Sequence, residues 1–340
     1  MIRDGAELDE QLSNPTDGVI DTFRRLDGDL IFLGIGGKMG PTLARMTRRA
    51  SDLAGGPQRR IYGAARFSSP GLPEELRAHG IEPLRCDLLD AEQVGQLPDV
   101  PNVVFMAGMK FGTTGQASLT WAMNCLAPAI VCQRYRSSRI VAFSTGNVYG
   151  LSPIAAGGSR ENDVLSPVGE YAMTAVGRER MFEHFSQQLG IPTVLVRLNY
   201  ACELRYGVLV DVAQKVLAGE PIDLNMPALN AIWQADANAM ALRLFDHVAS
   251  PPAVFNIAGS ETLRVRQIAE AFGKRFGKPT TFVGTESADA LLSNSERATA
   301  LFGRPRVSPD QMIGWIADWL LRGGTTLGKP THFESREGRF

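Results

Sequence analysis

One short segment constrains the fold of this chain more than any other: a glycine-rich loop that directly follows a strand-like apolar run. Residues Asp29–Leu33 read DLIFL, and residues Gly34–Gly40 read GIGGKMG. The loop fits the spacing G-x-x-G-x-x-G, whereas the more common G-x-G-x-x-G fails because Met39 stands at its last glycine position. Such a loop between a strand and a helix is typical of a tight turn that brings the backbone close to the pyrophosphate of a dinucleotide. Although glycines also mark ordinary turns, we predict that the loop binds a cofactor through Gly34, Gly37, Lys38, Met39 and Gly40.

Strand-like and helix-like segments alternate through the first 200 residues. Apolar runs typical of strands lie at Arg60–Ala65, Asn102–Met106, Arg139–Phe143 and Thr193–Leu198, and helical patterns lie at Pro41–Ser51, Leu119–Tyr135 and Tyr171–Leu189. This alternation indicates a parallel sheet covered by helices on both faces. We therefore predict an α/β fold, a doubly wound parallel (Rossmann) sheet, over residues 29–200. A helical extension over residues 1–28 precedes it, in which Thr16 begins a helix that Gly28 ends.

The pattern becomes looser after Leu198. Helices are expected at Leu209–Ala218, Val265–Phe276 and Gln311–Leu321, and a strand at Ala253–Ala258. We predict that residues 201–230 and 259–322 form a smaller C-terminal cap over the substrate, while the segment near 231–258 returns to the dinucleotide-binding domain. Residues 323–340 are a polar tail, for which docking on the protein or a partner and a loose surface arm are equally open.

Composition and charge exclude several classes of protein. Lys and Arg number 35 and Asp and Glu number 36, so the chain lacks the broad positive field that nucleic-acid binding uses. No run of about 18 apolar residues occurs, so we expect no membrane span. The Cys and His residues show no metal-ligand spacing, and no metal site is expected. Residues 1–30 carry more acids than bases, unlike a targeting peptide, so we expect a cytoplasmic protein.

The end of the second predicted strand distinguishes the two nicotinamide cofactors. A carboxylate there would hydrogen-bond the ribose 2′-hydroxyl of NAD, whereas Arg suits the 2′-phosphate of NADP. The sequence is AARFSS, in which Arg66, Ser68 and Ser69 offer phosphate contacts and no acid is present. We therefore expect NADP(H) to be favoured, with NAD(H) as the other candidate. The alternative is that Arg66 is only a solvated surface side chain.

Further motifs follow the later strands in a fixed order. Cys86-Asp87-Leu88 follows the third strand, MAGMK (Met106–Lys110) the fourth, and STGNVYG (Ser144–Gly150) the fifth. Asn124 lies in the helix after the fourth strand, and Tyr171 begins the helix after the fifth. This ordered set resembles the extended short-chain dehydrogenase/reductases, the NAD(P)-dependent epimerase/dehydratase family that includes UDP-galactose 4-epimerase, over roughly residues 29–322.

The resemblance implies which residues form the site. The expected cofactor contacts, from the adenine to the nicotinamide ribose, are Arg66, Asp87, Leu88, Ala107, Gly108, Lys110, Asn124 and Tyr171. Tyr171 stands at the position of the catalytic tyrosine, and Thr145 at the Ser/Thr position that hydrogen-bonds the reacting oxygen. The expected substrate contacts are Thr145, Asn199 and Trp233.

One departure from the family concerns the helix that starts with Tyr171. The family has Tyr-x-x-x-Lys, and here the residue four positions on is Ala175. The family lysine holds the nicotinamide ribose and lowers the pKa of the tyrosine. An unassisted tyrosine has a pKa near ~10, so at neutral pH it is an acid and a poor base. Arg178, one turn further along the helix, or Lys110 would be substitutes for the lost charge, but we expect Arg178 to be a surface residue.

A second departure concerns the substrate. Nucleotide-sugar members of the family carry an Arg for the diphosphate just before the segment that corresponds to residues 231–236, and here Leu229-Asn230 stands there. Loss of a charge-assisted phosphate contact weakens the case for a UDP-sugar substrate. Trp233 in this segment is either a wall of the substrate pocket or a core residue, and the sequence does not separate the two.

The function that these observations favour is an NAD(P)-dependent oxidoreductase acting on a small hydroxyl- or carbonyl-bearing compound, such as a sugar derivative or hydroxy acid, with Tyr171 as proton donor. The alternatives are an NAD(P)-dependent epimerase or dehydratase, and a catalytically silent NAD(P)-binding sensor or scaffold. The expected partners are a small-molecule substrate, neither nucleic acid nor membrane, and a second copy of the chain. The homodimer is expected because Leu119–Tyr135 and Tyr171–Leu189 occupy the positions that pair in many relatives.

Overall fold

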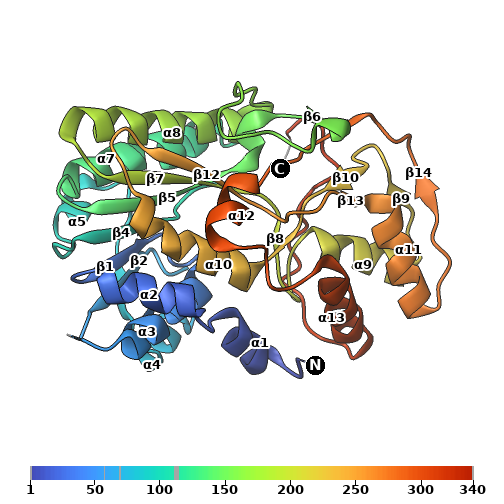
Figure 1. The fold of residues 1–340 in the computed structure, drawn as a ribbon, viewed down its shortest axis with the longest axis horizontal. Helices are drawn as coiled ribbons and strands as arrows, with labels where there is room; N and C mark the ends of the chain where they lie inside the picture. The colour runs from blue at the N-terminus through green and yellow to red at the C-terminus, as the bar shows by residue number, and fades with distance from the viewer. Residues whose placement is uncertain (1, 57, 69, 111–114, 339–340) are drawn as a thin grey trace.

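A seven-stranded sheet organises the first part of the molecule. The structure is a computed structural model, and it describes residues 2–56, 58–68, 70–110 and 115–338. The strands are all parallel and follow the order β12-β7-β5-β4-β1-β2-β3 (Figure 1). Their bounds are β1 Leu30–Leu33, β2 Ile61–Ala65, β3 Glu82–Arg85, β4 Asn102–Phe105, β5 Arg139–Thr145, β7 Thr193–Leu198 and β12 Ala253–Ile257. The predicted doubly wound parallel sheet is thereby confirmed.

Both faces of the sheet are covered because successive residues of a strand point to opposite sides. In β1, Leu30 and Phe32 pack into one layer, and Ile31 and Leu33 into the other. The first layer contains α2 (Asp17–Arg25), α3 (Gly40–Ala54), α4 (Leu72–Ala78) and α10 (Gln234–Arg243). The second contains α5 (Ala91–Gly95), α7 (Ala127–Arg134) and α8 (Gly169–Leu189), and Figure 1 shows α7 and α8 together on their own side of the sheet.

The N-terminal extension contains two helices where one was expected. α1 (Gly5–Leu12) precedes α2, which is capped by Thr16 as predicted. The expected end of α2 at Gly28 is wrong, because the helix ends at Arg25. Gly28, with φ +80°, instead makes the turn that leads into β1. Apolar residues of α1 and α2 join the same core as α3, so the extension is part of the packed body.

The C-terminal region lies beside the carboxyl ends of the strands. Three of its helices, α9 (Val208–Ala218), α11 (Val265–Phe276) and α13 (Pro309–Leu321), pack against one another. The short strand pairs are β6 (Ser152–Pro153) with β15 (Asp289–Ala290), β8 (Ala201–Cys202) with β11 (Ile232–Trp233), β9 (Ile222–Asp223) with β14 (Phe282–Val283), and β10 (Ala228–Leu229) with β13 (Leu263–Arg264). The other short elements are α6 (Ala117–Trp121), the π-helix η1 (Ala122–Leu126), the 3-10 helices η2 (Gly146–Tyr149), η3 (Ile154–Ala156) and η4 (Leu244–His247), and α12 (Glu296–Phe302).

The polar tail, up to residue 338, docks on the protein. The N–H and Oγ of Thr331 both donate to Asp211 Oδ2, at 2.7 and 2.6 Å. Phe333 is only 2% exposed and belongs to the core. Of the alternatives left open by the sequence, docking on the protein itself is therefore the observed one.

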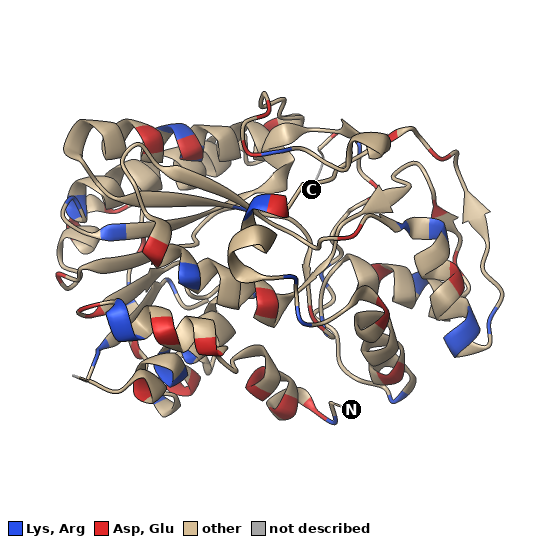
Figure 2. Ribbon diagram, viewed as in Figure 1, with Lys and Arg blue, Asp and Glu red and all other residues tan. Residues whose placement is uncertain are grey.

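Charged residues of both signs are interspersed over the helices (Figure 2). None of the helices in the described ranges combines the length and the apolar character that a membrane crossing requires. Over the same residues, His, Cys, Asp and Glu side chains do not gather in groups of three or more that could hold a metal ion.

Candidate active site

Two adjoining cavities lie at the carboxyl ends of the parallel strands. The large cavity, of about 640 Å³, extends from the glycine loop to the ends of β5 and β7. The small cavity, of about 260 Å³, extends from the same loop to the ends of β2 and β3. The residues that line both are Gly36, Gly37, Met106 and Gly108. A groove therefore runs along the edge of the sheet at which doubly wound folds bind their ligands.

The glycine loop makes a tight turn in which two of its glycines leave no room for a side chain. Gly34 has φ +90°, and a Cβ there would lie 2.6 Å from the backbone of Ala107. A Cβ on Gly40, the first residue of α3, would lie 2.0 Å from the Ile35 carbonyl oxygen. These two glycines are therefore needed for the close packing of the turn itself. Gly36 and Gly37 line both cavities and offer their backbone to a phosphate at the N-terminus of α3.

The small cavity gathers the residues predicted for the adenosine half of a cofactor. Arg66 and Ser68 come from the segment after β2, and Asp87 and Leu88 from the segment after β3. Ala107, after β4, closes the opposite side, and Ser69 lies outside the described residues. The guanidinium of Arg66 is thus the charged group that this cavity offers directly after β2, where NAD-specific folds place a carboxylate.

Thr145 and Tyr171 line the large cavity together. Thr145 is the last residue of β5, and its Oγ accepts hydrogen bonds from the backbone and side-chain nitrogens of Asn147, at 3.2 and 2.9 Å. Tyr171 lies in the first turn of α8 and has a side-chain hydrogen bond with Thr145. Burial raises the pKa of the Tyr171 hydroxyl, while the charge of Arg178 and the Thr145 hydrogen bond act in the opposite direction.

The expectation that Arg178 is a surface residue is wrong. Its side chain is 5% exposed, lines the large cavity, and donates to the Phe143 carbonyl oxygen at 3.0 Å and to Asn124 Oδ1. Helical side chains lean toward the N-terminus, so Arg178 covers the preceding turn, where the small side chain of Ala175 leaves room. The buried Nε of Arg178 has no hydrogen-bond partner among the described residues. A cation is therefore held beside Tyr171 by a residue one turn beyond the expected position.

Asn124 supports this arrangement from behind. It lies in the π-helix η1, and its Oδ1 accepts from the Met109 N–H at 3.0 Å as well as from Arg178. Its Nδ2 donates to Thr174 Oγ1 at 2.8 Å and to the Met109 carbonyl at 3.2 Å. Because these contacts occupy the amide, Asn124 positions Arg178 and the segment after β4. The cofactor contact expected of Asn124 from the sequence stays a prediction.

A buried charged network lies behind the end of β5. Glu179 of α8 pairs with Arg197 of β7 at 2.7 Å and accepts a hydrogen bond from Ser144 Oγ. Arg197 also donates to the Tyr149 hydroxyl at 2.7 Å, which in turn donates to Asn256 Oδ1 of β12 at 2.7 Å. The network joins α8, β5, β7 and β12, and it fixes the strand end that carries Thr145.

The two predicted substrate residues beyond β7 take different places. Asn199 lines the large cavity, and its buried Nδ2 has no hydrogen-bond partner among the described residues. A buried donor of this kind is suited to a ligand oxygen. Trp233, by contrast, packs edge-to-face on Trp315, with ring centroids 5.3 Å apart, and does not line the cavity. The core alternative therefore applies to Trp233, and the neighbouring Gln234 lines the cavity instead.

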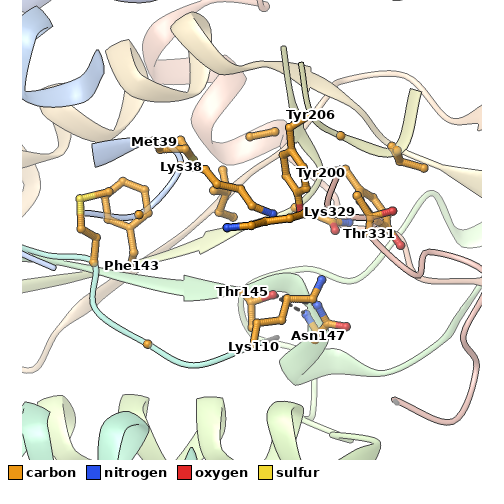
Figure 3. A pocket seen from close by; sticks show the side chains of 18 of the residues that line it. Lys38, Met39, Lys110, Phe143, Thr145, Asn147, Tyr200, Tyr206, Lys329 and Thr331 are labelled. Atoms are coloured by element: carbon orange, nitrogen blue, oxygen red, sulfur yellow. Dashed lines mark hydrogen bonds between the residues drawn. The ribbon is translucent and has the colours of Figure 1, made fainter. Parts of the chain in front are cut away.

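Residues that the sequence did not single out complete the large cavity. Tyr200 and Tyr206, which follow β7, line it together with the tail segment 328–332. Figure 3 shows Lys38, Lys329, Tyr200 and Tyr206 gathered on one side of this cavity. Tyr200 and His332 have left-handed φ values of 43° and 54°, which are uncommon outside glycine and often accompany functional sites. The sequence carries no local signal for Lys329, because its position depends on how the tail docks.

Comparison with protein-family models and solved structures shows which proteins this chain is similar to. The model of the NAD dependent epimerase/dehydratase family matches residues 31–226. The solved structure of UDP-glucuronic acid 4-epimerase from Bacillus cereus in complex with NAD is similar, with 17% identity, a TM-score of 0.71, and coverage of 87% of this chain and 98% of that chain. UDP-glucose 4-epimerase from Thermotoga maritima, with UDP-glucose, has 16% identity, a TM-score of 0.70, and coverage of 87% and 99%. No curated protein sequence matches the chain. Because the family model spans more than half of the residues, the chain belongs to the NAD-dependent epimerase/dehydratase family.

Proposed function

We propose that this protein uses NAD(P) to oxidise a hydroxyl-bearing carbon of a sugar-sized substrate transiently, as epimerases and dehydratases do. The observation that carries the proposal is the buried guanidinium of Arg178 beside Tyr171 and Thr145. Transient oxidation needs a tyrosine that serves first as base and then as acid. The sequence favoured a net oxidoreductase because Ala175 removes the family cation. Arg178 answers that objection from a different position on the same helix face.

The proton steps are assigned to two side chains. In the oxidation step, the Tyr171 phenolate accepts the proton of the substrate hydroxyl, and Thr145 holds the same oxygen by a hydrogen bond. In the return step, the Tyr171 hydroxyl gives the proton back to the oxygen. When bound, the nicotinamide supplies the acceptor and donor of the hydride. Arg178 is a positioning residue that stabilises the phenolate by its charge.

The cofactor is assigned to the groove by residues of both cavities. The glycine loop would hold the pyrophosphate, and Arg66, Asp87 and Leu88 the adenosine half. Gly108 is the point at which the groove passes over Arg178, since a Cβ there would lie 2.1 Å from Arg178 Nη2. The guanidinium takes the space that a side chain at this point would fill, so Gly108 lets Arg178 lie directly against the backbone after β4.

The substrate is assigned to the part of the large cavity beside Asn199, whose unpartnered amide suits a sugar hydroxyl or a phosphate oxygen. The Thermotoga relative is solved with UDP-glucose, which makes nucleotide sugars the first compounds to test. Asn230, which stands where nucleotide-sugar enzymes carry an Arg, is used internally. Its Oδ1 accepts from the Ser293 N–H at 2.9 Å and its Nδ2 donates to the Glu261 carbonyl at 3.2 Å. A phosphate would have to find its positive partners elsewhere in the cavity.

Net reduction of a carbonyl is the second candidate. Burial raises the pKa of Tyr171 despite Arg178, and a protonated tyrosine is suited to donate its proton to a developing alkoxide. This candidate predicts that each turnover consumes one reduced cofactor. Transient oxidation instead regenerates the cofactor within each turnover.

The two candidates separate in a product assay. The protein is incubated with UDP-sugars, free sugars and small carbonyl compounds in the presence of much less cofactor than substrate, supplied as NAD+ or NADP+ in one set and as NADH or NADPH in the other. Products are followed by proton NMR while absorbance reports the reduced cofactor. We expect more product than cofactor, no accumulation of reduced cofactor, and loss of product with Tyr171→Phe. Product formed one for one with cofactor would establish the oxidoreductase instead. Undiminished turnover by Tyr171→Phe would show that Tyr171 does not move the proton.

A further inference from the structure

We propose that Lys38, Lys110 and Lys329 form a binding site for an anionic oxygen group of the substrate, and that the C-terminal tail completes this site by carrying Lys329 into the large cavity. The inference rests on the proposed function for the placement of the substrate and deepens it by naming the substrate's charge. The anionic group is a diphosphate of a nucleotide or a carboxylate of a sugar acid, which share the chemistry that lysines recognise.

The three lysines reach the same cavity from separate parts of the chain. Lys38 belongs to the glycine loop, Lys110 to the segment after β4, and Lys329 to the tail, and all three line the large cavity (Figure 3). Lys38 Nζ lies 3.2 Å from the centroid of the Tyr206 ring, so its side chain is directed away from the adenosine end of the groove. Lys110 Nζ lies 5.7 Å from the centroid of the Tyr171 ring. A bound anion would therefore lie close to the proton-transfer residue.

The charge of the cavity differs from that of the chain as a whole. The chain carries 35 Lys and Arg against 36 Asp and Glu, but the described lining of the large cavity contains these three lysines and Arg178 and no Asp or Glu. Burial, with Lys110 and Lys329 next in effect, lowers the pKa of Lys38 to about 7, and burial lowers the pKa of Lys110 to about 8. Like charges held together in a desolvated place favour an anion as their partner.

The tail is built to hold Lys329 in place. Two residues further on, Thr331 makes its two hydrogen bonds to Asp211, which is the nearby carboxylate but lies outside the cavity lining. His332 adopts its left-handed φ of 54° directly after this anchor, and a strained residue of this kind persists only where its surroundings hold it. Phe333 then enters the core. Leu327, two residues before Lys329, donates its N–H to the Arg205 carbonyl at 2.9 Å, so the segment is held on both sides of Lys329.

The position of Lys329 separates a substrate site from a cofactor site. Lys38 and Lys110 are near the glycine loop and would reach a cofactor phosphate as well. Lys329 lies beside Tyr200 and Tyr206, and neither it nor these tyrosines line the small cavity (Figure 3). A cofactor phosphate alone would leave Lys329 without a function, so Lys329 is the residue to test.

The test measures binding to the full-length protein saturated with NADP+ or NAD+, by isothermal titration with UDP, with D-glucuronate and with neutral D-glucose. The variants are Lys329→Met, which removes the charge, and Lys329→Arg, which keeps it. Lys274→Met removes a positive charge from α11, outside both cavities, and is the matched control. Thermal melting of each variant checks that the tail change leaves the protein folded.

We expect UDP or D-glucuronate to bind the wild type, and Lys329→Met to weaken that binding at least ~10-fold. Lys329→Arg and Lys274→Met should bind nearly as the wild type does, and cofactor affinity should change little in all variants. Binding of UDP alone identifies a diphosphate, and binding of D-glucuronate alone a carboxylate. The proposal is overturned if neither anion binds better than D-glucose, if Lys329→Met binds the anion as tightly as Lys274→Met, or if Lys329→Met weakens only the cofactor. Because binding needs no turnover, its failure is distinct from failure of the product assay.

Discussion

Replacing Arg178 by methionine should raise the pKa of Tyr171 and slow the oxidation step at neutral pH. The guanidinium stabilises the charged phenolate, so its removal makes the proton harder to lose. Below the pKa, the rate of oxidation follows the phenolate fraction and falls tenfold for each unit by which the pKa rises. Donation of a proton to a carbonyl uses the protonated form and is affected less.

The size of the effect follows from helix geometry. Residues seven apart on a helix are separated by about 10.5 Å along its axis, and an arginine that leans toward the N-terminus spans roughly half of that distance. At about 6 Å and an effective dielectric constant of about 20, a cation stabilises the phenolate by about 3 kcal/mol, which corresponds to a change in the phenolate fraction of about 100-fold. Relaxation of the variant reduces this value, so we expect kcat/KM for oxidation to fall about 10- to 100-fold at neutral pH.

The assay is the pH dependence of kcat/KM for wild type, Arg178→Met and Arg178→Lys, with a substrate found in the product assay. The limb that rises with pH should move to higher pH in Arg178→Met and return toward wild type in Arg178→Lys, which keeps the charge. Thermal melting is a necessary control, because Phe143 and Asn124 lose a donor in the methionine variant. The reasoning fails if Arg178→Met melts like the wild type and its pH profile superimposes on that of the wild type.

Three further predictions follow from other parts of the structure. Arg66→Ala should weaken NADP(H) binding more than NAD(H) binding, because a guanidinium suits the 2′-phosphate; fluorescence titration of both reduced cofactors measures this, and an unchanged ratio of affinities would contradict it. The protein should have a dimeric mass by light scattering, because Leu126 of η1 and Met173 of α8 expose apolar side chains on the expected contact helices; Met173→Glu should lower that mass, and a monomeric wild type would disprove the dimer. Arg197→Met leaves Glu179 buried without its ion-pair partner and should lower the free energy of unfolding in urea by about 3–5 kcal/mol, whereas a loss below about 1 kcal/mol would mean that the network contributes little.

The sheet and the glycine loop could be predicted from the sequence because each produces a pattern of neighbouring residues. The runs that became β1, β4, β5 and β7 are buried on both faces, which makes them mostly apolar. Gly40 is required by the nearby backbone of Ile35, and Gly34 by that of Ala107 after β4. The loop is recognisable because its glycine spacing directly follows an apolar run. The order of the motifs then allowed Thr145 and Tyr171 to be predicted as parts of one site, and both line the large cavity.

The places of residues whose surroundings come from distant segments could not be predicted from the sequence in this way. The burial of Arg178 depends on Asn124 in a π-helix far away in the sequence, and a helix pattern alone assigns such an arginine to the surface. From the sequence, Trp233 could equally be a pocket wall, because its packing against Trp315 is seen only in the structure. Lys329 lies in a polar tail with no periodic pattern, and it reaches the cavity through tertiary contacts of the tail such as that of Thr331 with Asp211.

The docked tail also sets an order of events during synthesis. The glycine loop, Thr145 and Tyr171 leave the ribosome well before residues 328–332. β12, the edge strand of the sheet, is synthesised after Tyr171 and before the tail. Domains begin to fold from the N-terminal side as they emerge, so the dinucleotide groove takes shape while one wall of the adjoining cavity is still unmade. A nascent chain, or one cut by a protease ahead of Thr331, would then hold cofactor yet discriminate poorly among substrates. On the proposed substrate site, selectivity is in this sense acquired only after the cofactor groove has formed.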